Sequence, residues 1–436
     1  MLQTFQKHLQ SHFPKLESGR ILVAVSGGVD SVVLSHLCLE SDLNFSLAHC
    51  NFKLRNGESD ADEVFVTELA DALDVGIFIE SFETKAYAKE KKISVQMAAR
   101  ELRYNWFEEL RETLQFDYIF TAHHANDNLE TVLINFVRGT GLEGLTGMPE
   151  TNSYILRPLL PFSRVEIVSY ARKSHLKWRE DSSNASTKYL RNKIRHEVVP
   201  KLEELNPQLL ESFGKTLNHL QQSSLLIEDY ISAIFPRIAK EEDFGYSFKI
   251  KMLKTIPNLR AVIYELFRSF GFTEWEDVYD LLDAQPGKMV YSKTHRLIKD
   301  RGELLLTTTP SQANEKFGIS EEEEVVMLPI GTFHIDKVEE FSKASENIIF
   351  VDKEKLHFPL SVRKWKEGDS FHPFGMKGKK KLSKYFKDEK LSLPEKENSW
   401  LLCSQDEIIW VVGRRPDARF AITEDTRSIL RITYTS

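Results

Sequence analysis

A glycine-rich loop between a short apolar run and a helix-like segment is the feature that most constrains the fold. Val23-Ala24-Val25 is followed directly by Ser26-Gly27-Gly28-Val29-Asp30-Ser31, and helical spacing of apolar residues covers 32–39. This order of strand, glycine loop and helix brings free backbone N–H groups and the positive end of a helix to one point. The segment therefore predicts a phosphate-binding loop at the carboxyl end of a buried strand.

The loop residues also indicate which kind of phosphate group is bound. Gly27 and Gly28 let phosphate oxygens approach the backbone, and Ser26 and Ser31 add hydroxyl donors. Asp30 repels a bare anion, so it suggests a bridging Mg²⁺, which prefers carboxylate and phosphate oxygens together. The alternative is an ordinary glycine turn with a helix cap. The complete six-residue pattern after a β-branched strand favours nucleotide binding.

Strand-like and helix-like segments alternate over the first 200 residues. Strands are expected at 21–25, 45–49, 76–80 and 117–121, and helices at 32–39, 60–73, 96–114 and 127–138. Such alternation predicts an α/β fold, namely a Rossmann-like parallel sheet with helices on both faces.

The length of 436 residues predicts two or three domains. We expect a nucleotide-binding domain at 1–205, a small helical domain at 206–286 and a C-terminal α+β domain at 287–436. The acidic stretch 310–324 has the composition of a linker or exposed loop.

Composition excludes several classes of protein. No apolar stretch is long enough to span a bilayer, and the N-terminal residues are polar, so we expect a cytoplasmic location without a membrane. Cys38, Cys50 and Cys403 are far apart and form neither a disulfide framework nor a CxxC metal pair. The net charge of −7 argues against a general nucleic-acid binder, although its distribution matters more than its sum.

A second polar cluster follows the fourth expected strand, in "TAHHANDNLETVLINFVRGTGLEGLTGM". Because ligands lie beyond the carboxyl ends of parallel strands, His123 and His124 should face the same crevice as the glycine loop. Asp127 and Glu130 are three residues apart on one helix face and could hold a metal or an ammonium group. The alternative is a helix-terminal charge beside satisfied loop histidines. Zinc is disfavoured there because no third ligand is suitably spaced.

The SGGxDS pattern resembles the PP-loop family, the N-type ATP pyrophosphatases. The resemblance implies cleavage between the α and β phosphates of ATP, with an adenylated intermediate that a nucleophile displaces. The loop lacks the lysine of the common phosphate loop, which fits a loop that holds the leaving pyrophosphate.

Further motifs narrow this resemblance to the tRNA(Ile)-lysidine synthetase family. They occur in one order along the whole chain: "AHCNFKLR", "AARELRY", "TAHHANDNLET", "RGTGLEGLTGM", "RPLL", "EDSSNASTKYLRNKIRHEVVP" and "VRKWKEGDSFHPFGMKGKKKLSKYFKD". The family implies that ATP adenylates the C2 oxygen of the wobble cytidine, position 34, in a CAU-anticodon tRNA(Ile). Free L-lysine then displaces AMP and gives lysidine, which changes the codon from AUG to AUA and the identity from methionine to isoleucine.

The resemblance also assigns site residues. ATP would bind at Ser26, Gly27, Gly28, Val29, Asp30 and Ser31, with Mg²⁺ on Asp30 and Asp127. His123, Asp127 and Glu130 would line the lysine and metal side. Arg100 and Arg191 would lie near the phosphates and the reacting base, where a planar fork suits phosphate. The alternatives are a surface ion pair for each arginine and, for Arg191, an ordinary helix with a basic face.

Three positions depart from the usual family pattern. Asn126-Asp127 stands where two consecutive aspartates are common, with Asn128 where glutamine is common. Phe52 stands where histidine is common, so we assign it no catalytic role. Because Asn126 stands in place of an aspartate, the sequence leaves open which carboxylates ligate Mg²⁺.

A basic segment near the C-terminus interleaves cations and aromatic residues. Such a surface suits phosphate contacts and stacking on unpaired bases, and the resemblance implies recognition of the tRNA body. The alternative is a solvated lysine loop with core aromatics. The residues are Lys377, Lys379, Lys380, Lys381 and Lys384, with Trp365, Phe371, Phe374, Tyr385 and Phe386.

Two other classes of function stay open. One is a different PP-loop enzyme, such as a tRNA thiolase or an amidotransferase-coupled synthetase, although no cysteine lies in a motif suited to sulfur transfer and no glutaminase domain is evident. The other is a nucleotide-sensing RNA-binding module without enzymatic activity. A homodimer is one assembly that the sequence leaves open.

Overall fold

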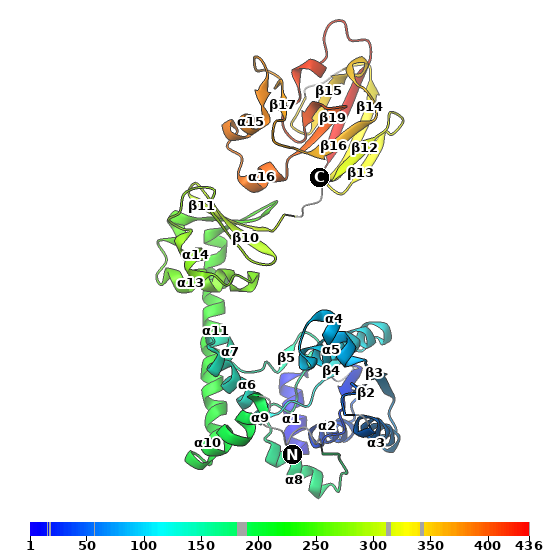
Figure 1. Ribbon diagram of the computed structural model, residues 1–436, viewed down its shortest axis with the longest axis vertical. Helices are drawn as coiled ribbons and strands as arrows, with labels where there is room; N and C mark the ends of the chain where they lie inside the picture. Colours follow the sequence, from blue (N-terminus) through cyan, green and yellow to red (C-terminus); the bar gives the residue numbers. More distant parts are fainter. Residues whose placement is uncertain are drawn as a thin grey trace. The chain divides into compact units, whose positions relative to one another are not determined.

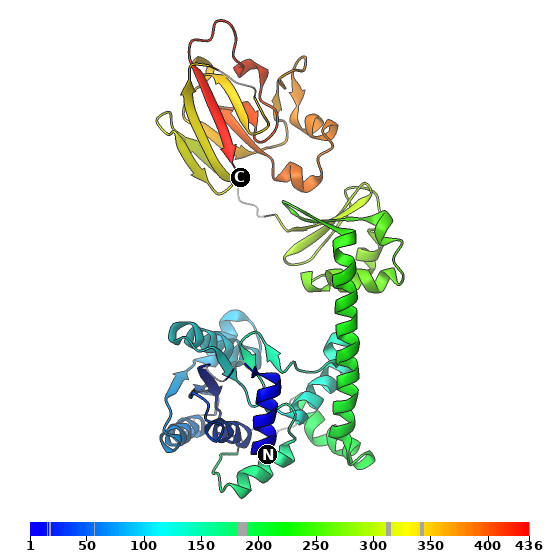
Figure 2. The same ribbon diagram turned by 180° about the vertical axis from the view of Figure 1, so that it is seen from behind.

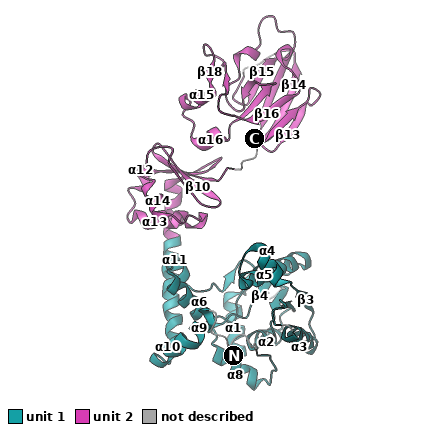
Figure 3. Cartoon of the chain, viewed as in Figure 1, with its two compact units in different colours: residues 1–228 teal, residues 229–436 magenta. Residues whose placement is uncertain are grey.

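The computed structural model describes residues 1–14, 16, 19–55, 57–180, 190–310, 315–340 and 344–435. The chain divides into two compact units, residues 1–228 and 229–436 (Figure 3). Among these described residues, no helix is both long and apolar enough to cross a membrane.

The first unit is built around a six-stranded sheet in the order β3-β2-β1-β4-β6-β5. The central strand β1 pairs in parallel with β2 on one side and with β4 on the other. The edge strand β5 is antiparallel to β6. Strand order reverses between β1 and β4, which is where an open α/β sheet binds its ligand. The strands are β1 (Ile21–Ala24), β2 (Phe45–Asn51), β3 (Ile77–Ser81), β4 (Tyr118–Phe120), β5 (Thr151–Asn152) and β6 (Ile155–Leu156).

Helices cover both faces of this sheet, as the sequence predicted (Figure 1). Side chains alternate along β1: Ile21 and Val23 enter a core with α1, α2, α3 and α8, whereas Leu22 enters a second core with α5. The helices are α1 (Leu2–His12), α2 (Val29–Leu39), α3 (Gly57–Leu73), α4 (Thr84–Lys91), α5 (Val95–Leu114) and α8 (Arg164–Lys173).

The remaining helices of this unit bring a later part of the chain beside β4. α6 (Ala125–Arg138) begins directly after β4, and α7 (Leu142–Leu145) follows. α9 (Leu190–Lys193) continues through a π-helical turn, η3 (Ile194–Val198), into α10 (Val199–Leu205). Leu129 of α6 is buried with Ile194 and Val199, so this packing fixes the π-helical turn against α6. α11 (Leu209–Ile238) runs across the boundary between the two units.

The second unit begins with a five-stranded antiparallel sheet in the order β7-β8-β11-β10-β9. Phe248 and Phe267 pack edge to face in its core, with ring centroids 5.1 Å apart. The elements are β7 (Ala239–Glu242), β8 (Gly245–Lys249), α12 (Ile250–Leu253), α13 (Leu259–Phe267), η4 (Arg268–Phe270), α14 (Trp275–Asp280), β9 (Met289–Tyr291), β10 (His295–Asp300) and β11 (Glu303–Thr308).

Two four-stranded sheets follow, in the orders β12-β16-β19-β20 and β13-β14-β21-β15. They share a core around the fully buried Trp410. A two-stranded sheet, β17 with β18, carries the basic segment. The elements are β12 (Lys316–Ile319), β13 (Val325–Leu328), β14 (Gly331–Val338), β15 (Ile348–Asp352), η5 (Lys353–Lys355), β16 (Leu360–Lys364), β17 (Ser370–Phe371), β18 (Lys380–Lys381), α15 (Leu382–Asp388), α16 (Leu393–Glu397), β19 (Trp400–Ser404), β20 (Glu407–Val411), η6 (Ala418–Phe420) and β21 (Ile429–Thr435).

Two local expectations were wrong. Strands β7 and β8 lie in the segment predicted to be only helical, and they pair in one sheet with strands from beyond residue 286. β12 lies within the acidic stretch 310–324 expected to be a linker, because its backbone pairs with β16. Pairing with distant strands overrides local composition in both cases. The three-domain division itself stays a prediction.

The central strands should be sensitive to loss of volume. Phe120 of β4 is fully buried, whereas Phe136 of α6 is 69% exposed. Phe120→Ala should lower the free energy of unfolding by about 3–5 kcal/mol because it leaves a cavity. Phe136→Ala should change it by less than about 0.5 kcal/mol. Urea denaturation measures both, and equal losses would contradict the assigned core.

Candidate functional site

The glycine loop closes on itself at the start of α2. The Ser26 backbone N–H donates to Ser31 Oγ at 3.2 Å, and the Ser31 hydroxyl donates to the Gly28 carbonyl at 3.0 Å. Gly27 has a φ of +84°, and a Cβ there would meet the Phe65 ring at 3.3 Å. The loop thus needs glycine at position 27 for both backbone conformation and space. It places the start of α2 at the carboxyl end of β1, as the sequence predicted.

Asp30 extends from the first turn of α2 toward two other elements. Its Oδ2 accepts a hydrogen bond from Arg164 Nη1 at 2.9 Å. Its Oδ1 lies 3.7 Å from His124 Nε2 and is buried without a hydrogen-bond partner. A buried carboxylate oxygen without a donor is the kind of group that a cation would satisfy.

The start of α6 holds Asp127 in a fixed position. The His124 backbone N–H donates to Asp127 Oδ2 at 3.1 Å, and the His124 ring nitrogen Nε2 lies 3.4 Å from the same oxygen. His124 is 1% exposed, between the carboxylates of Asp30 and Asp127. This histidine therefore joins the glycine loop to α6.

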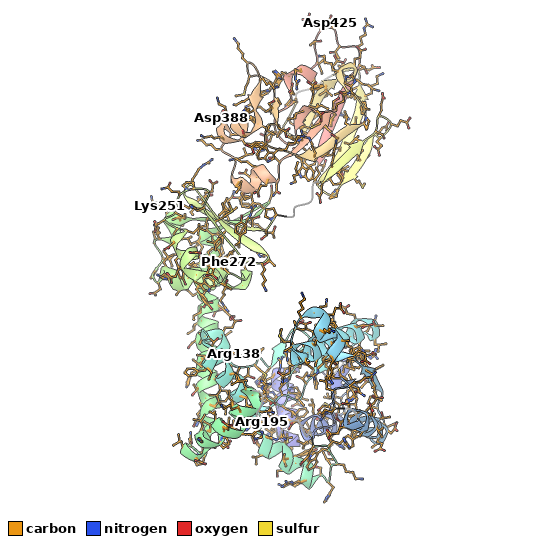
Figure 4. All side chains as sticks on the ribbon, viewed as in Figure 1. Arg138, Arg195, Lys251, Phe272, Asp388 and Asp425 are labelled. Carbon is orange, nitrogen blue, oxygen red and sulfur yellow. The ribbon has the colours of Figure 1, made fainter. Side chains whose placement is uncertain are left out.

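A guanidinium group bridges the two carboxylates that the sequence placed on one face of α6. Arg195 Nε donates to Glu130 Oε1 at 2.6 Å, and its Nη2 donates to Glu130 Oε2 at 2.9 Å and to Asp127 Oδ1 at 3.1 Å. Glu130 is 2% exposed, so its charge is already neutralised inside the protein. The expected role of Glu130 on the lysine and metal side stays a prediction. Arg195 lies in the π-helical turn and is labelled in Figure 4.

Arg191 lies one turn before Arg195 and is directed to the same helix. Its Nη2 hydrogen-bonds Thr131 Oγ1, and its Nε lies 3.6 Å from Glu130 Oε2. Its side chain is 43% exposed, so it keeps contact with solvent. The structure thus places Arg191 beside α6, and its role near the phosphates and the base stays a prediction.

Charges around α6 set the protonation of the site. Burial would raise the pKa of Asp127, but His124 and Arg195 outweigh that effect and hold the pKa below its usual value. Burial, opposed by Asp127 and reinforced by nearby arginines, lowers the pKa of His123 to about 4. His123 is therefore neutral at pH 7, and its Nδ1 shares a hydrogen bond of 2.9 Å with Thr121 Oγ1.

Arg100 reaches the site from α5, on the other side of β4. Its guanidinium lies over the Tyr104 ring, 4.7 Å from the centroid. The neighbouring Arg157 is buried, and its Nη1 donates to the Pro149 carbonyl at 2.7 Å. The charges of both arginines contribute to lowering the pKa of His123.

The residues that depart from the family pattern have structural roles. Asn126 Oδ1 accepts a hydrogen bond from the Arg164 backbone N–H at 2.9 Å, at the start of α8. Asn128 Oδ1 accepts one from the Met148 backbone N–H at 2.7 Å. Phe52 stacks on Phe82 with ring centroids 5.7 Å apart. A neutral amide at position 126 thus ties α6 to α8.

The predicted lysines gather around one pocket of about 650 Å³. Lys380 is paired with Asp388 at 2.8 Å and is largely buried, whereas the other four are exposed. The expectation of aromatic stacking is wrong for Phe371, Tyr385 and Phe386, which are at most 2% exposed because they form a core. Phe374 is 53% exposed and stays available. The lining is Met376, Lys377, Lys379, Lys380, Lys381, Lys384 and Asp388.

Sequence reasoning missed Arg195 and Arg164, which contact the acidic residues directly. Arg164 belongs to a segment without a recognisable ligand-binding pattern. Arg195 did stand in a quoted motif, four residues after Arg191, and that helical spacing could have placed both side chains on one face. Residues 181–189 of the same motif lie outside the described residues.

The cysteines do not suit sulfur transfer. Cys38 and Cys403 are buried, and burial raises the pKa of both thiols, that of Cys403 to about 11. Burial also raises the pKa of Cys50 to about 12. Reactive cysteines need a lowered pKa and access to solvent, so none of the three resembles a persulfide carrier.

Three family models match successive parts of the chain. Residues 1–202 match a PP-loop domain, residues 241–310 match a TilS substrate binding domain, and residues 360–433 match a TilS substrate C-terminal domain. The first match covers both the glycine loop and the α6 cluster. It confirms the PP-loop resemblance and the predicted fold class of this part of the chain.

Curated relatives match over nearly the whole length. The tRNA(Ile)-lysidine synthase of Parabacteroides distasonis is 40% identical over 100% of both chains. The enzymes with this name from Bacteroides thetaiotaomicron and Clostridium acetobutylicum are 38% and 30% identical, over 97% and 95% of each chain. Identity of this extent leaves one assignment: the chain belongs to the tRNA(Ile)-lysidine synthase family.

Proposed function

We propose that this chain uses ATP to ligate L-lysine to C2 of the cytidine at position 34 of a tRNA(Ile) with a CAU anticodon. The C2 oxygen attacks the α-phosphorus of ATP, and pyrophosphate leaves. The side-chain amine of lysine then attacks C2, loses a proton and displaces AMP. The product, lysidine, changes the codon from AUG to AUA, and the reaction takes place in the cytoplasm.

One observation carries this proposal. The glycine loop after β1 and the acidic start of α6 after β4 are joined by the buried His124, which lies 3.7 Å from Asp30 and 3.4 Å from Asp127. A nucleotide held on the loop would therefore meet the α6 cluster directly. This arrangement occurs in a chain 40% identical to a tRNA(Ile)-lysidine synthase over its full length.

The ATP side consists of Ser26–Ser31 and the start of α2. Backbone N–H groups and the helix dipole would bind the pyrophosphate, which the family reaction releases. Asp30 fits a divalent cation because its Oδ1 is buried without a donor, and with Asp127 it would hold Mg²⁺. Bound there, Mg²⁺ would neutralise charge on the phosphates.

The lysine side centres on Asp127. Its ionised carboxylate would attract the ammonium group of lysine, and neutral His123, oriented by Thr121, would accept a hydrogen bond from the amine. Glu130 acts through Arg195, which it holds against Asp127. We therefore assign Glu130 a positioning role in place of direct contact with lysine.

The RNA side combines separate cations. Arg100 and Arg191 are partly free of protein contacts and would bind the phosphates or the developing charge on the base. Exposed Lys377, Lys379, Lys381 and Lys384 would contact the tRNA backbone. In this proposal residues 1–205 carry the chemistry, while 206–286 and 287–436 bind tRNA. A homodimer stays a prediction for the assembly.

Two alternatives are weaker. A tRNA thiolase needs a reactive thiol or a metal-sulfur centre, and the three cysteines are buried or have raised pKa values. A nucleotide sensor without activity would have no use for a buried Asp127–Glu130–Arg195 network beside the phosphate loop. Both the lysidine-forming ligase and a tRNA thiolase would form AMP, whereas a sensor without activity would not.

The reaction itself gives the first test. Incubation of the protein with ATP, labelled lysine and the CAU-anticodon tRNA should place label on the RNA and release AMP and pyrophosphate. Chromatography of the nucleotides and scintillation counting of the RNA measure both products. Release of ADP and phosphate, or sulfur incorporation in place of lysine, would contradict the proposal. A methionine tRNA with the same anticodon serves as the control.

Loss of one carboxylate tests the lysine side. Asp127→Asn removes the charge for the ammonium group, so lysine transfer should fall by about 10²-fold or more while tRNA affinity stays within about twofold. Asp71→Asn, an exposed position on α3, is the matched control. A large loss of tRNA binding in Asp127→Asn would refute the assignment.

Salt dependence tests the lysine pocket. Replacing Lys379, Lys381 and Lys384 by glutamine should weaken tRNA binding. The slope of the logarithm of the binding constant against the logarithm of the salt concentration should become shallower by up to about 3. The same charge change at exposed Lys240, Lys251 and Lys337 is the control. Filter binding over a range of salt measures the slopes. An unchanged slope in the first variant would mean that these lysines do not touch phosphate.

A further inference from the structure

A cluster of two histidines and a glutamate lies outside the proposed active site. His8 and His12 are one turn apart on α1, the blue helix beside the N label in Figure 2, and Glu150 precedes β5. Each offers a ligand atom, and these atoms lie within 4.8 Å of one another. Among the described residues, no other group of histidine, cysteine or acidic side chains meets this condition.

The centre of the cluster lacks a polar partner. The His8 side chain is 9% exposed, and its Nε2 has no hydrogen bond. The carboxylate oxygen Glu150 Oε1 lies 3.7 Å from this nitrogen. Two ligands of a tetrahedral zinc ion, each about 2.0–2.1 Å from the metal, are about 3.4 Å apart. The separation of His8 Nε2 and Glu150 Oε1 is therefore close to that of two zinc ligands.

The second histidine is oriented as metal ligands usually are. His12 Nδ1 lies 2.8 Å from Ser11 Oγ and 3.3 Å from the His8 carbonyl oxygen. Ligating histidines commonly donate their other ring N–H to a carbonyl or hydroxyl oxygen, which fixes the ring. With Nδ1 engaged in this way, Nε2 of His12 would be the ligand atom. The centroids of the His8 and His12 rings are 4.3 Å apart, so the two rings lie side by side.

The unpaired Nε2 of His8 lies 3.7 Å from the carboxylate of Glu150. A divalent ion between these side chains would give Nε2 a partner and neutralise the carboxylate.

We propose that His8, His12 and Glu150 form a binding site for a zinc-type transition-metal ion, with a fourth position left for water. Two imidazoles and one carboxylate suit Zn²⁺ better than Mg²⁺, which prefers oxygen ligands. The site would tie α1 to the segment before β5. It is independent of the proposed ligation reaction, and either can fail alone.

The same segment supports the active site. The Glu150 carbonyl accepts the Arg157 backbone N–H at 2.9 Å, and the Pro149 carbonyl accepts Arg157 Nη1 at 2.7 Å. Met148, which precedes Pro149, donates its backbone N–H to Asn128 Oδ1 of α6 at 2.7 Å. A metal on Glu150 would therefore stiffen the segment that positions Arg157 beside His123.

Metal binding by the full-length protein tests the site. After treatment with a chelator and dialysis, titration with Zn²⁺ against a chromogenic chelator should give one bound ion per chain, and an excess of Mg²⁺ should not displace it. His12→Ala should weaken Zn²⁺ binding by about tenfold or more, because it removes a ligand. Glu150→Gln should act in the same direction, and Zn²⁺ should raise the thermal midpoint of the wild type more than that of either variant.

Two controls keep the outcome clear. His219→Ala changes an exposed histidine on another helix, α11, and should leave Zn²⁺ affinity unchanged. Circular dichroism of His12→Ala should match the wild type, since His12 is exposed; His12→Asn is the second variant if it does not. Absence of Zn²⁺ binding to the wild type, or equal affinity in His12→Ala, His12→Asn, Glu150→Gln and His219→Ala, would overturn the proposal.

Discussion

The parallel pairing of β1 with β4 is the constraint on which the candidate site depends. Ile21 and Val23 of β1 are in register with Tyr118 and Phe120 of β4. The two strands consequently end side by side, and whatever follows each of them shares one edge of the sheet. The glycine loop follows β1, and the histidine-acid segment follows β4. Asp30 and His124 are 94 residues apart in the sequence, yet their side chains lie 3.7 Å apart.

Charge compensation then organises this edge. The three acidic residues at this edge are buried or partly buried, and each has an arginine partner. Asp30 pairs with Arg164, and Asp127 pairs with Arg195. Glu130 pairs with both Arg195 and Arg191. A buried carboxylate without such a partner would be strongly destabilising. Removing Arg195 would therefore disturb both acidic residues, and its effect could not be assigned to either one alone. The π-helical turn has a functional rationale here, since it carries Arg195 toward α6.

Local patterns in the sequence predicted the first unit well. The strands expected at 21–25, 45–49, 76–80 and 117–121 each overlap β1 to β4, because a buried parallel strand and its flanking turns leave a strong apolar signal. The two-residue strands β5 and β6 were not predicted, since so short a segment has no periodicity. The strands β7, β8 and β12 were missed for a related reason: their pairing partners, β11 and β16, lie far along the chain.

The sequence by itself determined the phosphate loop, its place after a strand and the family of the chain, because these depend on residue order over short spans. It also placed Asp127 and Glu130 on one helix face, because helical periodicity is local. Only the tertiary structure decided that Glu130 is buried against Arg195 and that Phe371, Tyr385 and Phe386 form a core. It also brought Glu150 to His8 and His12. These features are contacts between residues distant in the chain or the burial of a side chain. Both kinds of feature depend on packing between secondary-structure elements.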